Sequence, residues 1–453
     1  MMDAHRTPTD ADHASRRAAE ERHPTLVIAF HPEPAYIGRN RTLEDGEVLL
    51  IGRNSRVLGA GALNDTRVSR EHAEVRRSGD DVRIRDLESR NSTWVNGEPI
   101  TTATLAPGDV IEIGDLVLVV QFLPVRWFPP RHPRLVGISA ALAGVLAQVD
   151  QVAQGFSTVL LLGETGTGRE LVAREIHEGS GRSGPFVALD CGGLPDDLVH
   201  SELFGHVEGA FPGADRDQTG LLEAARGGTL FLNEIGGASL VLQGNLLRFL
   251  EEGAARPLGS DRAIQSDARV IVSTDRSLRE LVEAGSFRED LLARLSRGEI
   301  LVPPLRERRE DIVPLATYFA RRYTDGPVVL SRALAVALLI QPWPGNVREL
   351  QGVVERAAVE GVEEDRVELT PWVEEVLRPE VDDGTSPLVG TEPRARPEPE
   401  VLVAALRARV GNVSVAATDL GVSRSTLYRW MRDARIDLER LSYEWEDLTD
   451  PWP

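Results

Sequence analysis

Residues 163–170 have the composition and spacing of a loop that binds a phosphate group. They read Gly163, Glu164, Thr165, Gly166, Thr167, Gly168, Arg169 and Glu170. Glycines let several backbone N–H groups face one small volume, and the start of a helix adds a positive end to it. The general pattern G-x-x-x-x-G-K-[ST] has a lysine that reaches the β- and γ-phosphates, where this chain has Arg169. The segment therefore predicts ATP binding by a loop with an unusual cation.

Such a loop needs a strand before it and a helix after it. The apolar run 159–162 directly precedes the glycines and predicts the strand, and the helix should begin near Arg169. Between residues 134 and 305, further apolar strands alternate with helical patterns. This alternation is typical of a parallel sheet covered by helices, an α/β architecture.

The composition excludes several classes of protein. The chain has 453 residues, of which 42% are hydrophobic, enough for roughly three packed domains. A single cysteine excludes an internal disulfide framework and indicates a reducing, cytoplasmic location. No apolar run approaches the roughly 18 residues of a membrane span, so we expect no membrane contact. The formal charge of −20 argues against general coating of nucleic acid, although a local basic element could bind DNA.

All 51 basic residues are arginine. A genome that favours arginine codons accounts for such a bias on the surface. It accounts less well for Arg169, because a lysine required for function should resist the bias.

Composition divides the chain into successive segments. Short β-type runs separated by Gly and Asp turns predict an all-β sandwich first, and helical patterns follow the α/β region. A segment rich in Pro, Asp, Glu and Gly then reads as a linker before a last helical module. The predicted boundaries are a disordered lead at 1–24, a sandwich at 25–123, an α/β region at 134–305, a helical region at 306–378, a linker at 379–397, a helical module at 398–440 and an acidic tail at 441–453.

Three motifs in the β-rich segment occur in a specific order. They are Gly52-Arg53, then Ser69-Arg70-Glu71-His72, then Asn91 to Gly97 (Asn-Ser-Thr-Trp-Val-Asn-Gly). This order resembles the forkhead-associated (FHA) domain, which binds phosphothreonine peptides. Loops at one end of a sandwich can present arginine, hydroxyl and amide donors to a phosphate. The resemblance implies that the phosphopeptide is held by Arg53, Ser69, Arg70, Arg90 and Asn91.

The central region carries a longer series of motifs. After the phosphate-binding loop come Ser201 to His206, the loop at 209–214, Gly227 to Ile235, Phe287 to Leu291, and Trp343 to Leu350. Their unbroken order resembles the AAA+ domain of sigma-54-dependent transcription activators. The resemblance implies an α/β P-loop subdomain followed by a helical lid.

The resemblance also implies roles for individual residues. Asn233 and Glu234 occupy the acidic pair that holds Mg²⁺ and polarises the attacking water. Arg288 and Arg294 match arginine fingers that reach the nucleotide of a neighbouring subunit, and Arg348 matches the lid arginine that senses nucleotide. Fingers that act between subunits imply a homo-oligomeric ring. The loop that contacts the sigma factor comprises Gly209, Ala210, Phe211, Pro212, Gly213 and Ala214.

This chain departs from the family pattern where hydrolysis and sigma contact take place. Arg169 replaces lysine, and the two are not equivalent at a tight phosphate site. Asn233 replaces an aspartate, which removes a negative charge and should weaken Mg²⁺ binding. Asp190 replaces the asparagine that usually precedes the cysteine, and Asp275 replaces an asparagine of the sensor. Pro212 replaces a threonine, which removes a hydroxyl and an N–H group.

The last predicted module combines helices with a local positive charge. A helix at 414–420 ends at Gly421, and another begins near residue 423, which is the spacing of a helix-turn-helix. Over 423–435 the net charge is +3, from four arginines and one aspartate. The sequence resembles the Fis-type domain that ends many sigma-54 activators. The DNA contacts that we expect are Arg424, Ser425, Thr426 and Arg429.

Together these segments predict a multidomain fold: an all-β FHA sandwich, an α/β AAA+ domain with a helical lid, and an all-α helix-turn-helix. The expected protein is a DNA-binding transcription regulator that links a phosphothreonine protein or peptide to double-stranded DNA. Its AAA+ domain would bind ATP and Mg²⁺ with hydrolysis lost or impaired. It would form a homo-oligomer or a mixed ring with active relatives.

Two alternatives remain open at this point. The first is an active ATPase that remodels the sigma-54 RNA polymerase holoenzyme despite these substitutions. The second is a phosphopeptide-binding adaptor that uses the AAA+ region only to form oligomers. Restoring the family residues at 169, 212 and 233 would distinguish the first alternative, and failure to bind any DNA would favour the second.

Overall fold

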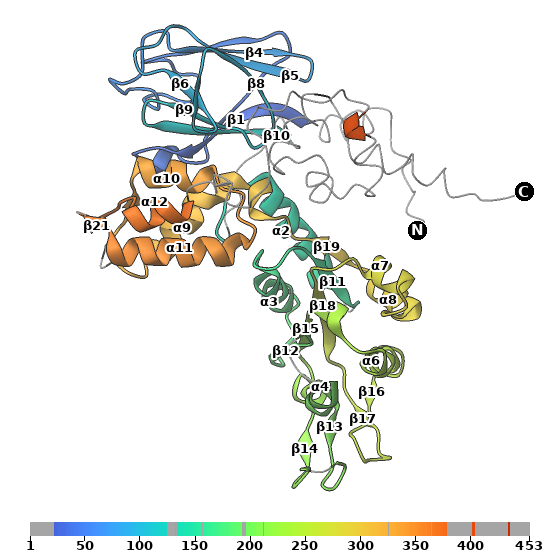
Figure 1. The fold of residues 1–453 in the computed structure, drawn as a ribbon. Coiled ribbons are helices and arrows are strands. Elements are labelled where there is room, and N and C mark those ends of the chain that lie inside the picture. Colours follow the sequence, from blue (N-terminus) through green and yellow to red (C-terminus); the bar gives the residue numbers. More distant parts are fainter. Residues whose placement is uncertain are drawn as a thin grey trace, which may run out of the picture. The chain divides into compact units, whose positions relative to one another are not determined.

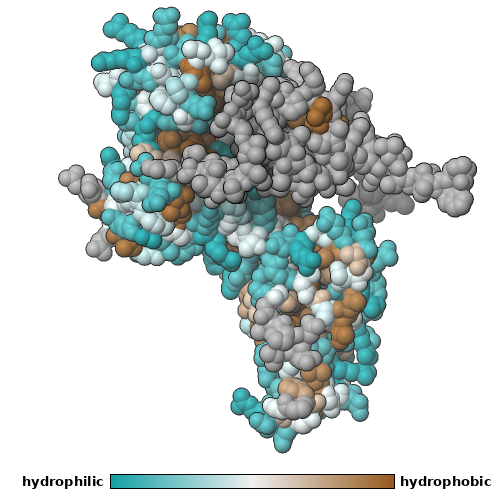
Figure 2. Space-filling view, viewed as in Figure 1, coloured by the Kyte–Doolittle hydropathy of each residue, from teal (hydrophilic) through white to brown (hydrophobic). Residues whose placement is uncertain are grey.

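The computed structural model describes residues 22–124, 132, 134–155, 157–192, 196–211, 213–324, 326–363, 365–377, 401–403 and 434 (Figure 1). The chain divides into two compact units, residues 1–377 and 378–453. The first unit contains a β-sandwich, an α/β region and a helical lid. Within the described residues, no helix is both long enough and apolar enough to cross a membrane. Hydrophilic residues predominate among the residues that Figure 2 colours by hydropathy.

Two antiparallel sheets form the sandwich, as the sequence predicts, in the strand orders β2-β1-β10-β9-β6-β7 and β3-β4-β5-β8. Their inner faces share one core because alternate side chains point inward, as with buried Val82 and Ile84 in β5. The strands are β1 Arg22–Phe30, β2 Asn40–Thr42, β3 Val48–Ile51, β4 Ala73–Ser78, β5 Asp81–Asp86, β6 Thr93–Val95, β7 Glu98–Ile100, β8 Thr102–Leu105, β9 Val110–Ile113 and β10 Leu116–Pro124.

Two features of the sandwich differ from the prediction. Strand β1 begins at Arg22, so residues 22–24 belong to the sheet and not to the predicted lead. They pair with the end of β10, where Arg22 lies opposite Pro124. The short strands β2, β7 and β8 are not evident in the sequence, because each has only three or four residues and little apolar alternation.

The α/β region contains a five-stranded parallel sheet in the order β12-β15-β18-β11-β19. Alternate residues of its central strands contribute to two separate cores, so apolar side chains cover both faces. This arrangement confirms the predicted parallel sheet. The strands are β11 Val159–Leu162, β12 Phe186–Asp190, β15 Thr229–Asn233, β18 Arg269–Thr274 and β19 Glu299–Leu301.

Helices and two small hairpins surround this sheet. Hairpin β13–β14 projects from the region and lies against hairpin β16–β17, since Leu258 N donates to Gly205 O at 2.9 Å. The helices are α2 Ala140–Ala153, α3 Arg169–Gly179, α4 Asp196–Phe204, α5 Leu221–Ala224, α6 Leu240–Glu252, α7 Leu278–Glu283 and α8 Glu289–Leu295. The hairpin strands are β13 Gly205–His206, β14 Gln218–Thr219, β16 Ala254–Ala255 and β17 Ile264–Gln265.

The lid packs four helices around the fully buried Trp343, whose indole N–H donates to Leu338 O at 2.9 Å. They are α9 Ile312–Ala320, α10 Arg332–Leu339, α11 Asn346–Glu360 and α12 Pro371–Leu377. A small sheet of β20 Val329–Leu330, β21 Val362–Glu363 and β22 Arg366–Val367 joins them. The sequence predicted only helices here, because strands of two residues carry no periodic signal.

The sandwich and the lid share one hydrophobic core. Phe30 and Val117 from the sandwich belong to the same buried cluster as Ile312 and Leu334 from the lid. Polar contacts surround this cluster: Arg332 donates to Glu112 Oε2 at 2.5 Å, and Gln121 donates to Glu310 Oε2 at 2.8 Å. The sequence predicts the two parts as separate segments and gives no sign of this contact.

Candidate functional site

The predicted phosphate-binding loop connects β11 to α3. Gly166 and Gly168 have φ angles of 81° and 101°, a backbone conformation that residues with a side chain rarely adopt. Gly168 is also the N-cap of α3. A Cβ atom on Gly166 would lie 2.3 Å from Gly345 O of the lid, so only glycine fits at this contact. The loop therefore has the strand, turn and helix order that the sequence predicts.

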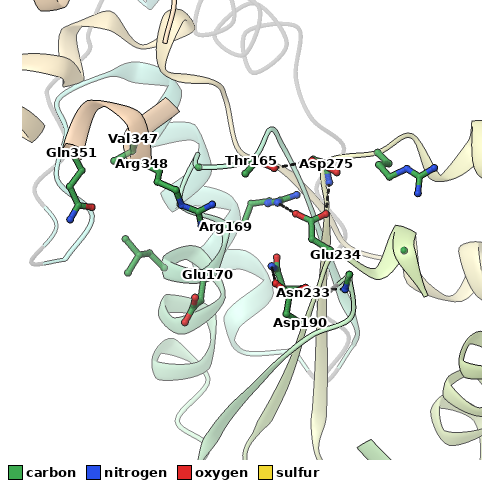
Figure 3. Close-up of a pocket in the computed structure, with 16 residues that line it drawn as sticks. Thr165, Arg169, Glu170, Asp190, Asn233, Glu234, Asp275, Val347, Arg348 and Gln351 are labelled. Atoms are coloured by element: carbon green, nitrogen blue, oxygen red, sulfur yellow. Dashed lines mark hydrogen bonds and ion pairs between the residues drawn. The ribbon is translucent and has the colours of Figure 1, made fainter. Parts of the chain in front are cut away.

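A cavity of about 790 Å³, which we call the nucleotide cavity, opens beside this loop (Figure 3). It brings together predicted nucleotide-binding residues from three regions: the loop, the end of β15 and the start of α11. Gly163, Glu164 and Thr167 do not line it. The predicted residues that do are Thr165, Gly166, Gly168, Arg169, Glu170, Asn233, Glu234 and Arg348.

Arg169 forms an ion pair with Glu234 inside this cavity (Figure 3). The Arg169 side chain is only 6% exposed, and its Nη1 atom is buried without a hydrogen-bond partner among the described residues. Burial raises the pKa of Glu234, and the Arg169 guanidinium offsets part of that rise. The cation of the loop is therefore engaged with the carboxylate that the family pattern assigns to water activation.

Asn233 ends β15, and its amide is held on both sides. Ser273 Oγ donates to Asn233 Oδ1 at 2.6 Å, and Asn233 Nδ2 donates to Asp190 Oδ2 at 3.1 Å. Asp275, the altered sensor residue, accepts a hydrogen bond from Thr165 Oγ1 at 2.9 Å. Asp190, Asn233 and Asp275, three positions where the chain departs from the family pattern, therefore all line the cavity beside the loop.

The lid is tied directly to the loop. Glu164 accepts hydrogen bonds from both terminal nitrogens of Arg306, at 2.6 and 2.7 Å, and these bonds lower the pKa of Glu164. Asn346 Nδ2 donates to Thr165 O at 3.0 Å, and Val347 N donates to Gly166 O at 3.0 Å. Glu164 therefore acts in the structure as a link to the lid.

A second cavity of about 370 Å³, largely apolar, shares Gly168, Leu171, Val347 and Gln351 with the first. The sequence gives no sign of this cavity, because its side chains follow the pattern of ordinary core positions. Only the approach of the lid to α2 and α3 brings them together. Its apolar walls include Leu135, Val136, Leu142, Val172, Val302, Leu315 and Phe319.

Neither predicted finger lines the nucleotide cavity of its own chain. Arg288 pairs with Asp290 at 2.7 Å, and Arg294 donates to Leu250 O at 2.7 Å. Both arginines are therefore held away from that cavity by contacts within the chain.

The predicted sigma-contact loop lies in the turn between β13 and β14. The ring of Phe211 packs edge-on against His206, with 5.0 Å between the ring centroids. Ala210 lies against Gly259, in the turn of the second hairpin. Pro212 lies outside the described residues.

Magnesium is held in many nucleotide sites by one or two carboxylates together with phosphate oxygens and water. Among the described residues, no three His, Cys, Asp or Glu side chains converge as a metal cluster. Asp190, Glu234 and Asp275 nevertheless line the nucleotide cavity. This donor set fits a magnesium ion that arrives with a nucleotide.

The five predicted phosphopeptide residues lie on two neighbouring loops of the sandwich, β3–β4 and β5–β6. Arg53 donates to Thr66 O and Val68 O at 2.7 and 2.8 Å. Ser69 Oγ accepts from Arg90 N at 3.0 Å, and Asn91 Nδ2 donates to Arg67 O at 2.7 Å.

Two further residues fix these loops. A Cβ atom on Gly52 would lie 1.9 Å from Arg70 O, so this approach requires glycine. His72 is fully buried and contacts Ser69 N and Ser92 O, so its ring supports the structure of both loops. Burial lowers the pKa of His72.

Comparison with known proteins agrees with this arrangement. The chain is 44% identical over 317 residues to the transcriptional regulatory protein ZraR of Klebsiella oxytoca, a match that covers 67% of this chain and 70% of ZraR. The profile of the Sigma-54 interaction domain matches residues 135–301. The chain belongs to the sigma-54-dependent transcription regulators.

The other domains of this regulator match known families in the predicted order. The FHA domain profile covers residues 37–114, the AAA+ ATPase lid domain 306–382, and the bacterial regulatory protein, Fis family, 394–433. The predicted DNA contacts Arg424, Ser425, Thr426 and Arg429 lie outside the described residues. These matches confirm the predicted family and fold class.

Further similarities are shorter or weaker. The anaerobic nitric oxide reductase transcription regulator NorR of Salmonella newport (strain SL254) is 48% identical over 236 residues, which is 51% of this chain and 47% of NorR. The match thus spans about half of NorR. A crystal structure of NtrX from Brucella abortus in complex with ADP is 30% identical, with a TM-score of 0.49, and covers 67% of this chain and 69% of that chain.

Proposed function

We propose that this regulator binds DNA, couples phosphothreonine recognition to transcription control, and binds ATP in an AAA+ domain that hydrolyses it slowly or not at all. The ion pair between Arg169 and Glu234 is the observation that supports slow hydrolysis. A carboxylate that polarises water must present its negative charge to that water. The Arg169 guanidinium bound to Glu234 reduces that negative charge. It also competes with the water molecule for the same carboxylate oxygen.

The two adjoining cavities support nucleotide binding. The first contains the backbone cradle and Arg169, which suit the phosphates, and the second has the apolar walls that suit a purine base. The Arg169 Nη1 atom is buried and has no hydrogen-bond partner among the described residues, which destabilises the fold. An anionic ligand in the cavity would supply that partner.

Assembly of several subunits is part of the proposal. Arg288 and Arg294 are engaged away from the nucleotide cavity of their own chain. Leu240 and Val241 of α6 are exposed apolar side chains, of the kind that a second subunit could cover.

The Fis-type profile at 394–433 supports the DNA-binding role.

Purified full-length protein tests the AAA+ part of this proposal. We expect a fluorescent ATP analogue to bind in the presence of Mg²⁺, and ATP hydrolysis to remain near background even at high protein concentration. Rapid hydrolysis by the unmodified protein would contradict the proposal and favour the active ATPase. Failure to bind any DNA sequence in a selection experiment would favour the oligomeric adaptor.

The contact between the sandwich and the lid supports coupling between the phosphothreonine and nucleotide sites. At the sandwich end, Arg67 carries the backbone carbonyl that Asn91 binds, and it pairs with Asp115 beside Arg332. Arg332 lies on α10 of the lid and also donates to Gly114 O at 2.9 Å. A ligand that moves the phosphopeptide loops would therefore act on a lid helix.

A second set of contacts continues to the phosphate-binding loop. Gln121 of the sandwich donates to the buried Glu310, which lies beside Arg308. Burial raises the pKa of Glu310 to about 8, with the adjacent Asp311 carboxylate adding to the rise. Arg308 donates to Thr167 O in the loop at 2.8 Å. A series of contacts through Gln121, Glu310 and Arg308 thus connects the sandwich to the phosphate-binding loop.

Replacing Arg332 with alanine should reduce this coupling. In the unmodified protein we expect a phosphothreonine peptide selected from a degenerate library to change the Kd of a fluorescent ADP analogue by about fivefold or more. In Arg332→Ala the change should fall below about twofold, because the lid loses its ionic links to Asp115 and Glu112. Arg321→Ala, an exposed arginine at the end of α9, is the control. Equal ADP affinity with and without peptide in the unmodified protein would contradict coupling.

A further inference from the structure

Asp190 and Asn233 lie side by side at the ends of two neighbouring strands (Figure 3). Strands β12 and β15 are parallel, and their register places residue 190 opposite residue 233. The family pattern has asparagine at the first position and aspartate at the second. Two departures that are 43 residues apart in the sequence are therefore a single exchanged pair in space. The exchange retains one carboxylate and one amide at this edge of the cavity.

The hydrogen bonds fix which group presents an oxygen. Asn233 accepts from Ser273 Oγ through Oδ1 and donates to Asp190 through Nδ2. A flipped amide would place its oxygen against the Asp190 carboxylate, which is repulsive, so the network favours the observed orientation. The Asn233 oxygen is therefore already engaged.

Asp190 retains the capacity to bind a further group. Its Oδ1 accepts from Gly192 N at 2.9 Å and its Oδ2 accepts from Asn233, although each carboxylate oxygen can accept more than one bond. Asp190 is exposed and lines the nucleotide cavity. The same cavity holds the buried, unpartnered Nη1 atom of Arg169, which independently indicates an anionic ligand such as a phosphate.

We propose that Asp190 supplies the carboxylate that positions magnesium on a bound nucleotide, in place of residue 233. A magnesium ion held by phosphates and water needs only one or two carboxylates from the protein. The simpler explanation is that Asp190 only caps the turn at Gly192. The inference rests on nucleotide binding by the phosphate-binding loop, as proposed above, and concerns which residue orients its metal.

The test measures the magnesium dependence of nucleotide affinity in the full-length protein. The Kd of a fluorescent ADP analogue would be determined with Mg²⁺ and with EDTA for the unmodified protein, Asp190→Asn, and the double variant Asp190→Asn/Asn233→Asp. We expect Mg²⁺ to tighten binding about tenfold in the unmodified protein and to have almost no effect in Asp190→Asn, since losing a residue that orients a metal commonly costs 10–100-fold. The double variant should regain the dependence, because the carboxylate returns at position 233.

Asp267→Asn is a matched control. Asp267 also accepts a backbone N–H, from Gly227 at 2.8 Å, but it does not line the nucleotide cavity. Its variant should keep the full magnesium dependence. Recovery in the double variant also excludes misfolding as the cause of the loss in Asp190→Asn.

The outcomes separate this inference from the proposed function. If Asp190→Asn keeps the magnesium dependence of the unmodified protein, Asp190 only caps its turn and the inference is wrong. If the unmodified protein binds nucleotide equally well with Mg²⁺ and EDTA, the inference is wrong while nucleotide binding stands. If it binds no nucleotide under either condition, the proposed nucleotide function fails, and the inference fails with it.

Discussion

Replacing Arg169 with lysine should raise ATP hydrolysis at least about 100-fold over the unmodified protein, the range typical of a single charge-stabilising group in an active site. The planar guanidinium of Arg169 engages Glu234, whereas a lysine ammonium at the end of a flexible chain can turn toward the phosphates. Glu234 would then be free to orient water. Steady-state phosphate release at high protein concentration with Mg²⁺ measures the effect.

The structure offers a close control for this substitution. Arg174→Lys changes the same residue types on the same helix, at an exposed side chain that pairs with Glu170 at 2.7 Å. It should leave hydrolysis at background. If Arg169→Lys binds ATP but hydrolyses it no faster than the unmodified protein, the ion pair with Glu234 is not what limits turnover. Adding Asn233→Asp should then be examined, although Asp190 is expected to make that change dispensable.

Replacing Arg53 with alanine should weaken phosphothreonine peptide binding about 100-fold, because it truncates a charged partner of the phosphate. The same change removes the two hydrogen bonds that Arg53 donates to Thr66 O and Val68 O, so the loop loses order as well. Fluorescence anisotropy with labelled phosphothreonine peptides selected from a library measures the loss. The unphosphorylated peptides define the baseline.

Two further variants show whether the loss is specific. Arg56→Ala removes an exposed arginine from the same loop and should bind as the unmodified protein does. Ser69→Ala removes the hydroxyl that accepts from Arg90 N without changing charge, and should weaken binding by a smaller factor. Unchanged affinity in Arg53→Ala would place the phosphate elsewhere on the sandwich.

Much of the fold follows from local sequence patterns. The apolar runs that form β11, β15 and β18 are continuous because a parallel sheet is buried on both faces, and that property is readable from composition alone. The glycine spacing at 163–168 predicts the turn before α3 because backbone conformation is a local property. Short elements such as β7 and β20 were missed, since two or three residues carry too little pattern.

Contacts between distant segments could not be predicted in the same way. Asp190 and Asn233 are separate departures from the family pattern in the sequence, but the register of β12 and β15 places them in contact. The sequence predicts that Arg169 binds phosphates, whereas the structure pairs it with Glu234, 65 residues away. The sandwich and the lid are separate segments in the sequence, yet Phe30 and Ile312 share one core.

The amino-acid sequence was enough to predict the order of the domains, the parallel sheet, the phosphate-binding turn and the family to which the chain belongs. These depend on residue types at short, fixed spacing, where backbone sterics and hydrophobic periodicity act locally. The folded chain was needed to show which charges neutralise one another and which surfaces are buried together. Those outcomes depend on distances between atoms that the chain brings together through packing, and at a few ångströms the electrostatic energy of a pair changes steeply with separation.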